Sequence, residues 1–321
     1  MPRAVRIEST GGPEVLAVAE VEQRQPGTGQ LLVDIAAAGV NYIDTYQRSG
    51  VYSVPLPFVV GTEGAGTVTS VGEGVTGFSV GDRVAWASAP GSYAEQALVP
   101  AAQAVAVPDG VPDESAAALP LQGYTAHYLV NSTYPVREGD TVLVHAAAGG
   151  VGLLLVQLAK ARGATVIGTV STTEKEQLAR QAGADEVLRY DGFAERAREL
   201  TGGEGVAAVY DGVGKSTFDG SLASLRRRGM LVLFGGASGQ VPRFDLQRLN
   251  SGGSLFVTRP TLVDHIATRE ELIWRSGELF GAVAEGKLEV RIGGRYPLAE
   301  ATAAHRDLEG RRTTGKLLLI P

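Results

Sequence analysis

A run of small residues near the middle of the chain has the composition and spacing to bind a phosphate. Ala147, Gly149 and Gly152 occupy the three places of a G-x-G-x-x-G pattern, with alanine in the first. Such a turn needs little side-chain bulk where it is tight, where an anion approaches the backbone amides and where a helix packs on a strand. A pyrophosphate is then favoured at the start of the helix. We expect it to contact Ala148, Gly149, Gly150, Val151 and Gly152.

The flanking segments have the patterns needed to position this turn. Residues 141–144 form a short β-rich apolar run, and residues 153–161 repeat apolar positions with helical spacing. A second strand is expected at 164–170, directly after Gly163. Strand, turn, helix and strand make a βαβ unit, which is the context that gives the glycine pattern its meaning.

The end of the second strand indicates which dinucleotide would bind. An NAD site normally has Asp or Glu here to accept hydrogen bonds from the ribose 2′-hydroxyl. This strand instead ends in Val170-Ser171-Thr172-Thr173, so no carboxylate repels a 2′-phosphate. Ser171 could donate a hydrogen bond and Lys175 could supply a charge, which predicts NADPH. Glu174 remains a possible ribose acceptor, which would favour NADH.

Composition and charge exclude several classes of function. A chain of 321 residues with 44% hydrophobic content can bury two cores. A net charge of −6 argues against nucleic acid as a partner. Zero cysteines exclude disulfides, Cys-ligated zinc and a thiol nucleophile. No stretch approaches 18 apolar residues, so no membrane span is expected and the cytoplasm is the expected location.

The order of patterns along the chain predicts an α/β protein with two domains. The first hundred residues are β-rich, with strands expected at 4–7, 15–21, 31–37, 66–71, 83–87 and 92–99. Helices are then expected at 114–119 and 124–131, before strands and helices alternate. Alternation predicts a doubly wound parallel sheet. Its later elements are expected at 174–181, 186–190, 193–200, 207–211, 216–227 and 230–234.

After this sheet the chain returns to the first domain. A helix is expected at 270–284, with strands at 288–292 and 316–320. Residues 1–122 and 262–321 therefore form the first domain, a predicted β-barrel or β-sandwich, and residues 123–261 form the nucleotide-binding domain. Ligands lie at the carboxyl ends of parallel strands. The loops 211–214 and 235–239 are thus expected to line the ribose and nicotinamide, with Phe234, Gly235, Ser238 and Gly239 among the cofactor contacts.

The chain resembles a known family over essentially its whole length. The stretch 139–160, with its Ala147-Ala148-Gly149-Gly150 core, resembles the signature of the zinc-independent quinone oxidoreductases, the zeta-crystallin family of the medium-chain dehydrogenase/reductase superfamily. Segments 41–46, 61–66 and 315–321 are similar to that family too. The resemblance implies a Rossmann domain, a chaperonin-10-like (GroES-like) barrel as the catalytic domain, and a homodimer that pairs through an edge strand at 255–257.

The resemblance also implies roles for individual residues. It places Tyr46 and Thr125 at the nicotinamide, Lys175 and Tyr190 around the adenosine phosphate, and Arg311 near the same phosphate. Asn41 and Tyr46 are the polar groups expected to orient a substrate carbonyl. Plainer roles stay open: loop hydrogen bonding for Asn41 and Tyr46, a helix-start position for Thr125, and a solvated helix lysine for Lys175.

A metal-free reaction is expected. In zinc-dependent alcohol dehydrogenases of the superfamily, a cysteine follows a Gly-Val pair and a histidine precedes a Glu-Gly-Ala-Gly turn. Asn41 and Thr62 stand at these places here, and neither is a credible zinc ligand. Without a Lewis acid the substrate must accept hydride readily by itself, as quinones and activated enones do.

The predicted function is NADPH-dependent quinone reduction, with hydride transfer in a cleft between the domains. Two alternatives remain at this point. One is an enone or enoyl-thioester reductase on the same scaffold. The other is a structural or regulatory NADPH-binding protein with little turnover, since a fold does not establish chemistry.

Overall fold

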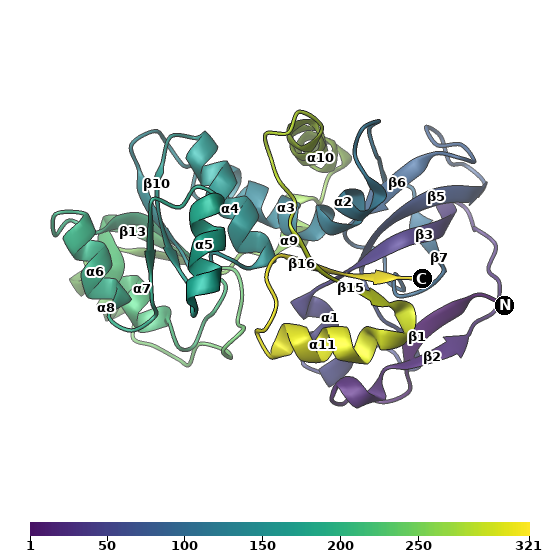
Figure 1. Cartoon of the computed structure of the whole chain (residues 1–321), viewed down its shortest axis with the longest axis horizontal. Helices are drawn as coiled ribbons and strands as arrows, with labels where there is room; N and C mark the ends of the chain where they lie inside the picture. Colours follow the sequence, from purple (N-terminus) through teal and green to yellow (C-terminus); the bar gives the residue numbers. More distant parts are fainter. The chain divides into compact units, whose positions relative to one another are not determined.

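The chain forms two compact units, and a computed structural model describes all of its residues, 1–321 (Figure 1). The barrel unit comprises residues 1–124 and 266–321, and the parallel-sheet unit comprises residues 125–265. Sequence analysis placed the boundaries at 122/123 and 261/262. No helix has the length and apolar character needed to span a bilayer.

The barrel unit is built around one long strand, β3 (Gln30–Val40). β3 pairs antiparallel with three other strands, β5, β7 and β16. Its apolar residues Leu31, Val33 and Val40 are buried in the core. The other strands of the unit are β1 (Arg3–Ile7), β2 (Ala17–Glu20), β4 (Phe58–Val59), β5 (Glu63–Val71), β6 (Arg83–Trp86), β7 (Gln96–Pro100), β8 (Val105–Ala106), β15 (Ile292–Pro297) and β16 (Lys316–Ile320).

Four helices and two 3₁₀ turns complete the barrel unit. The sheet order is β15-β16-β3-β5-β6-β8, and a smaller sheet runs β2-β1-β4. The helices of this unit are α1 (Tyr42–Ser49), α2 (Asp113–Ala118), α10 (Arg269–Ala284) and α11 (Ala301–Glu309), with 3₁₀ turns η1 (Pro13–Val15) and η3 (Leu298–Glu300). Leu298, Ala301 and Ala304 pack into the same core as β3, so the last helix is part of the barrel unit.

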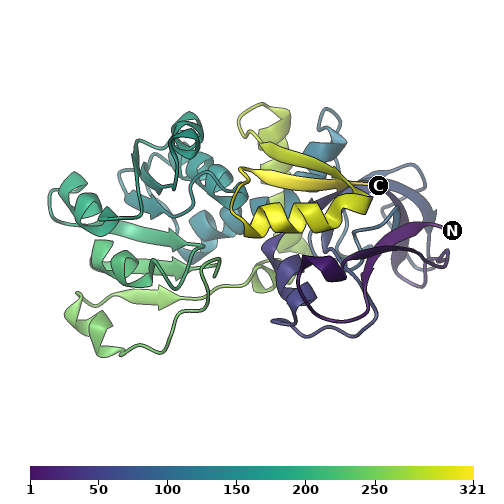
Figure 2. The same ribbon diagram turned by 60° about the horizontal axis from the view of Figure 1, so that its bottom comes forward.

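The parallel-sheet unit has six strands in the order β11-β10-β9-β12-β13-β14, all parallel (Figure 2). The chain switches direction across the sheet between β9 and β12, where ligands bind in folds of this kind. The strands are β9 (Thr141–Val144), β10 (Thr165–Thr169), β11 (Glu186–Leu188), β12 (Val206–Asp211), β13 (Leu225–Leu233) and β14 (Phe256–Thr258). The helices are α4 (Gly150–Ala161), α5 (Thr173–Gln181), α6 (Phe193–Leu200), α7 (Phe218–Ser224), α8 (Gln247–Ser251) and α9 (Leu262–His265).

Several elements differ from the sequence-based expectation. α3 (Pro120–Tyr128) begins four residues before the expected helix 124–131, because proline is well tolerated in the first turn. It continues as a π-helical turn, η2 (Leu129–Thr133). α7 ends at Ser224 and not at residue 227, since Leu225 already pairs with β12. The strand expected at 288–292 is wrong: β15 begins at Ile292. α1 was not predicted.

Candidate functional site

The turn after β9 has the compact geometry that the glycine pattern requires. Ala146 has φ of 51°, and its N–H donates to the hydroxyl oxygen of Tyr190 at 3.1 Å. The N–H of Gly149 donates to Ala146 O at 2.8 Å, which closes the turn. A Cβ on Gly152 would lie 2.3 Å from Ala146 O, so only glycine lets α4 start this close to the turn.

The start of α4 presents an anion-binding end. The amides of Gly150, Val151 and Gly152 make no backbone hydrogen bond, as expected for a first helical turn. No acidic residue stands in that turn to compete for them. With Ala148 and Gly149 just before the helix, the segment can hold a pyrophosphate through its backbone and the helix dipole.

A buried polar cluster beneath the turn fixes the ends of three strands. His145 Nε2 lies 2.9 Å from Ser221 Oγ, and His145 Nδ1 lies 2.8 Å from Thr169 Oγ1. Ser221 donates to Asp211 Oδ2 at 2.9 Å, so its oxygen accepts from His145 Nε2–H. Thr169 then donates to Nδ1, and the ring is neutral. Burial lowers the pKa of His145 to about 4, partly opposed by the charge of Asp211.

The loops after β12 and β13 form a second wall of the candidate cofactor site. The carboxylate of Asp211 accepts from the amides of Val213 and Gly214 at 2.8 and 2.9 Å, so it anchors its own loop. Ser238 Oγ donates to Val213 O at 2.8 Å, which ties the loop 235–239 to it. A Cβ on Gly235 would lie 2.5 Å from Gly212 O, so the two loops touch backbone to backbone. Phe234 is partly buried beside Gly212.

The residues expected at a 2′-phosphate lie around the start of α5. Thr172 caps this helix, accepting from the amide of Lys175 at 3.2 Å. Ser171 is exposed just before the cap. Lys175 lies in the first turn of α5, where its positive charge interacts unfavourably with the helix dipole. A bound anion would offset this unfavourable interaction. Arg189, which sequence analysis overlooked, donates to Thr173 Oγ1 at 3.2 Å and pairs with Glu176 at 3.0 Å.

The barrel unit contains a buried charged cluster that includes Asn41. Lys316 Nζ donates to Asn41 Oδ1 at 2.6 Å and contacts Glu63 Oε2, and both charged side chains are fully buried. Asn41 Nδ2 donates to Glu63 Oε2 at 2.8 Å and to Gly39 O at 3.3 Å. Both amide hydrogens therefore already have acceptors. A substrate carbonyl could bind Asn41 only by replacing one of them.

A second branch of this cluster runs from Asp44 to α11. Asp44 Oδ2 accepts from Asn41 N at 2.8 Å and from Tyr93 OH at 2.9 Å. Tyr93 OH lies 3.1 Å from His305 Nε2, and Arg48 NH1 lies 3.1 Å from His305 Nδ1. Arginine only donates, so Nδ1 accepts and Nε2–H donates toward Tyr93. All three hydrogen bonds therefore run in one direction, toward Asp44.

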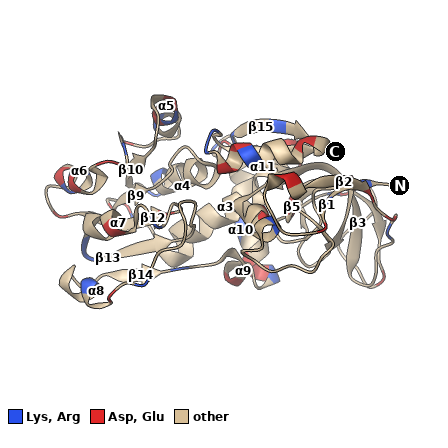
Figure 3. Cartoon of the chain, turned by 90° about the horizontal axis from the view of Figure 1, so that it is seen from below, with Lys and Arg blue, Asp and Glu red and all other residues tan.

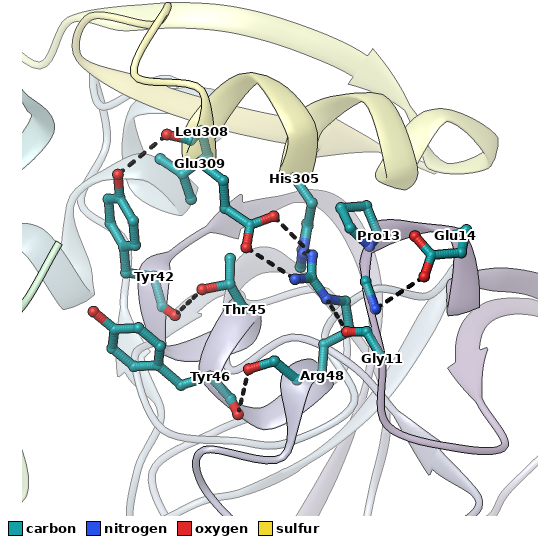
Figure 4. A network of polar contacts seen from close by, with 12 residues as sticks. Gly11, Pro13, Glu14, Tyr42, Thr45, Tyr46, Arg48, His305, Leu308 and Glu309 are labelled. Atoms are coloured by element: carbon teal, nitrogen blue, oxygen red, sulfur yellow. Dashed lines mark hydrogen bonds and ion pairs between the residues drawn. The ribbon is translucent and has the colours of Figure 1, made fainter. Parts of the chain in front are cut away.

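The protonation of this branch follows from its burial. Desolvation raises the pKa of Asp44 to about 7, against the lowering effect of hydrogen bonds from Asn41 and Tyr93. Desolvation lowers the pKa of His305 to about 3, and the nearby Arg48 adds to this. Arg48 is held in place by a two-pronged contact with Glu309 at 2.9 and 3.0 Å (Figure 4).

The residues in place of zinc ligands do not form a metal site. Thr62 Oγ1 donates to Asp44 Oδ1 at 3.3 Å, and the oxygen of Asn41 is already bound by the ammonium of Lys316. A divalent cation here would meet a buried positive charge and two poor ligands. Throughout residues 1–321, no three His, Cys, Asp or Glu side chains gather in a way that could hold a metal ion.

The remaining site candidates occupy separate places. Tyr46 lies on α1, half buried, and contacts Tyr52 edge to face with ring centroids 5.5 Å apart. Tyr52 is 46% exposed and was not singled out in the sequence. Thr125 is buried inside α3, so it is not a helix-start residue. Arg311 is exposed after α11 with φ of 55°.

Sequence reasoning missed Lys316, Tyr93 and His305 as members of the buried cluster. A local signal did exist for α1, because Asn41 and Asp44 have the spacing of a capping box. The contacts of Lys316 and His305 had no such signal, since their partners are more than two hundred residues away in the chain.

Comparisons with known proteins agree on one family. Residues 27–109 match the family described as alcohol dehydrogenase GroES-like domain, and residues 150–271 match the zinc-binding dehydrogenase family. A quinone oxidoreductase from Pseudomonas aeruginosa is 47% identical, and the alignment covers 100% of each chain.

Solved structures agree with these matches. A mycobacterial protein complexed with NADPH is 56% identical with a TM-score of 0.97, covering 99% of this chain and 100% of that one. The quinone oxidoreductase of Escherichia coli complexed with NADPH is 45% identical with a TM-score of 0.97, also covering 99% and 100%. The architecture is accordingly a GroES-like barrel domain with a Rossmann-type domain, as the sequence predicted.

Proposed function

Because the chain belongs to the quinone oxidoreductase family of the medium-chain dehydrogenase/reductase superfamily, we propose that it is an NADPH-dependent quinone reductase that works without zinc. The observation that carries the metal-free part is the contact of Lys316 with Asn41 and Glu63, since it puts a buried ammonium where a catalytic cation would be needed. The absence of thiol ligands agrees with it.

NADPH, when bound, supplies the hydride and makes a metal unnecessary for an acceptor as reactive as a quinone. The amides at the start of α4 bind its pyrophosphate. Ser171 and Lys175 bind the 2′-phosphate with Tyr190, whose hydroxyl oxygen accepts from Ala146 N–H and so lies beside the turn. The loops holding Phe234, Gly235, Ser238 and Gly239 line the ribose and nicotinamide. Thr125 and Arg311 are further proposed contacts.

Tyr46 is the side chain of the barrel unit that we propose to contact the nicotinamide and the quinone. Its ring contacts Tyr52 edge to face, and its centroid lies 6.3 Å from that of the Tyr42 ring. Aromatic rings held in this way offer a flat, apolar surface suited to a planar acceptor. The proton that completes reduction comes from solvent or from a hydroxyl near Tyr46.

We also propose a homodimer that pairs through β14. This strand ends the parallel sheet and has a partner on one side only, β13 (Figure 2). Its residue Phe256 is 55% exposed, and an unpaired apolar edge is a template for a second copy. Light scattering measures the mass of each protein in solution, and we expect a dimer for the wild type and a monomer for Val257→Pro. A wild-type monomer would contradict the proposal.

The function is tested by NADPH oxidation with three acceptors: 1,4-benzoquinone, an enone such as cyclohexenone, and an enoyl thioester. Benzoquinone should give the highest kcat/KM. Faster turnover of the enone or thioester would favour the alternative reductase. NADPH binding without oxidation in the presence of any acceptor would instead indicate a binding protein. Tyr46→Phe is the matched control for Tyr46→Ala, because it keeps the ring and removes only the hydroxyl.

A further inference from the structure

A basic depression lies on the parallel-sheet unit, at the end of the sheet where the strands begin, opposite the phosphate turn. Its volume is about 820 Å³, and its lining residues come from α6 and from the amino ends of β12, β13 and β14. In a parallel sheet the amino ends of the strands lie opposite the carboxyl ends, and the phosphate turn follows a carboxyl end. The depression is lined by Arg198, Gly203, Glu204, Arg226, Arg227, Arg228 and Phe256.

Two of these arginines have structural partners. Arg198 donates to the carbonyls of Ala223, Leu225 and Gly203 at 2.7 to 3.2 Å, which fixes its guanidinium. Arg226 pairs with Asp140 at 3.2 Å. These two side chains would hold this part of the fold even with no ligand present.

Arg227 and Arg228 have no such explanation. Both are exposed, and neither makes an ion pair with Asp or Glu (Figure 3, basic residues of β13 in blue). The lining holds four arginines against a single glutamate, in a chain whose net charge is −6. Like charges that line one depression repel one another, so folding alone would not favour them.

Arg227 and Arg228 lie in a short segment of β13 that does not pair with β12. Val206 pairs with Leu225 and Ala208 pairs with Met230, so residues 226–229 leave the ladder. Arg228 has φ of 58°, and its N–H donates to Gly253 O at 2.8 Å. Glycine or asparagine is normally preferred in this conformation, because a longer side chain there costs stability. Strained residues of this kind cluster at binding sites.

We propose that this depression is a second anion site, which binds a polyphosphate chain through Arg227 and Arg228. Planar guanidinium groups bind phosphate oxygens in pairs, and a chain of phosphates can span several arginines at once. The shared chemistry is the polyphosphate, supplied either free or as part of a nucleoside triphosphate.

The test is calorimetric titration of NADPH-saturated protein with inorganic tripolyphosphate and, separately, with ATP, both without divalent cations. Saturation with NADPH keeps the probes out of the cofactor site. We expect saturable binding with a dissociation constant on the order of 0.1 mM at low salt. Tighter binding of ATP than of tripolyphosphate would identify the nucleotide as the source; equal affinity would identify free polyphosphate.

Arg227→Gln and Arg228→Asn should each weaken tripolyphosphate about tenfold, and the double variant should abolish binding. Asparagine tolerates positive φ, so the fold is kept, and thermal unfolding without ligand checks this. Arg196→Gln, on the same helix as Arg198 but outside the depression, is the matched control and should bind as the wild type does. No saturable binding, or equal losses in Arg196→Gln and the test variants, would overturn the proposal.

Discussion

The ammonium of Lys316 lies 2.6 Å from the side-chain oxygen of Asn41, although 275 positions separate the two residues in the chain. The same ammonium contacts the carboxylate of Glu63, and both charges are out of contact with solvent. The last strand of the barrel unit, β16, is therefore joined to β5 by a buried ion pair, and Asn41, which precedes α1, hydrogen-bonds to both partners.

Lys316→Met should destabilise the protein strongly. The substitution keeps the length of the side chain but leaves the carboxylate of Glu63 buried without its cation, which typically costs about 3–5 kcal/mol. Urea unfolding measures the loss. The double variant Lys316→Met/Glu63→Gln should recover most of it, because no unpaired charge remains. A single-variant loss below about 1 kcal/mol would contradict this account of the pair.

Asp44→Asn should change how stability depends on pH. The folded-state pKa of Asp44, about 7, lies above its ordinary value of 3.8. The stability that the protonated carboxyl contributes is thus present below about pH 4 and is lost as the pH rises through 7. His305 and His145 act in the opposite direction, because their folded-state pKa values, about 3 and 4, lie below 6.5.

The histidine contributions cancel in the difference between variant and wild type. We expect the free energy of unfolding of Asp44→Asn, minus that of the wild type, to increase between pH 4 and 7 by up to about 1.4 kcal/mol per pH unit. Asn41 N–H and Tyr93 OH can still donate to the asparagine oxygen, so the network survives. A difference that stays constant with pH would contradict the raised pKa of Asp44.

Gly152→Ala should weaken NADPH at least tenfold, equivalent to about 1.4 kcal/mol. Its Cβ would lie 2.3 Å from Ala146 O, so the turn must open before the helix can start. Gly149→Ala is the matched control, since its Cβ would meet that oxygen at 3.1 Å and needs a smaller adjustment. Fluorescence titration measures both affinities. Wild-type affinity in a folded Gly152→Ala protein would remove the turn from the pyrophosphate site.

Lys175→Ala should weaken NADPH about 10- to 150-fold and leave NADH almost unchanged, because only NADPH has the 2′-phosphate. Lys287→Ala serves as the control, since Lys287 is an exposed lysine of the barrel unit that pairs with Glu285. The measurement is the dissociation constant of each cofactor for each variant. Equal losses of affinity for both cofactors, or a wild type that prefers NADH, would contradict this. Glu174 would then be the acceptor for the ribose 2′-hydroxyl of NADH.

The parts of the fold that sequence predicts best are those set by local pattern. The turn 147–152, α4 and β10 are contiguous, and their small and apolar residues specify strand, turn and helix without distant contacts. The error at α7 has a clear cause. Leu225 and the arginines after it favour a helix by propensity, but Leu225 pairs with Val206 of β12, so the helix must end before it.

The candidate site divides in the same way. The phosphate turn and the start of α5 are local, so residues such as Gly152 and Lys175 could be identified from spacing. The surroundings of Asn41 could not, because Lys316 and Glu63 reach it only through β16 and β5. Comparison with the zinc-ligand positions of the superfamily therefore predicted that Asn41 binds no zinc, but it could not predict that the side-chain amide is already fully hydrogen-bonded.

The central claim is direct hydride transfer from NADPH to a quinone without a metal. The most direct measurement is a single turnover of the NADPH-loaded protein mixed with 1,4-benzoquinone, before and after exhaustive chelation, using NADPH with deuterium at the transferred position. We predict rapid oxidation of the bound nicotinamide, slowed by deuterium and unchanged by chelation. Loss of the reaction on chelation with recovery on adding zinc, or bound NADPH that stays reduced in the presence of quinone, would contradict the claim.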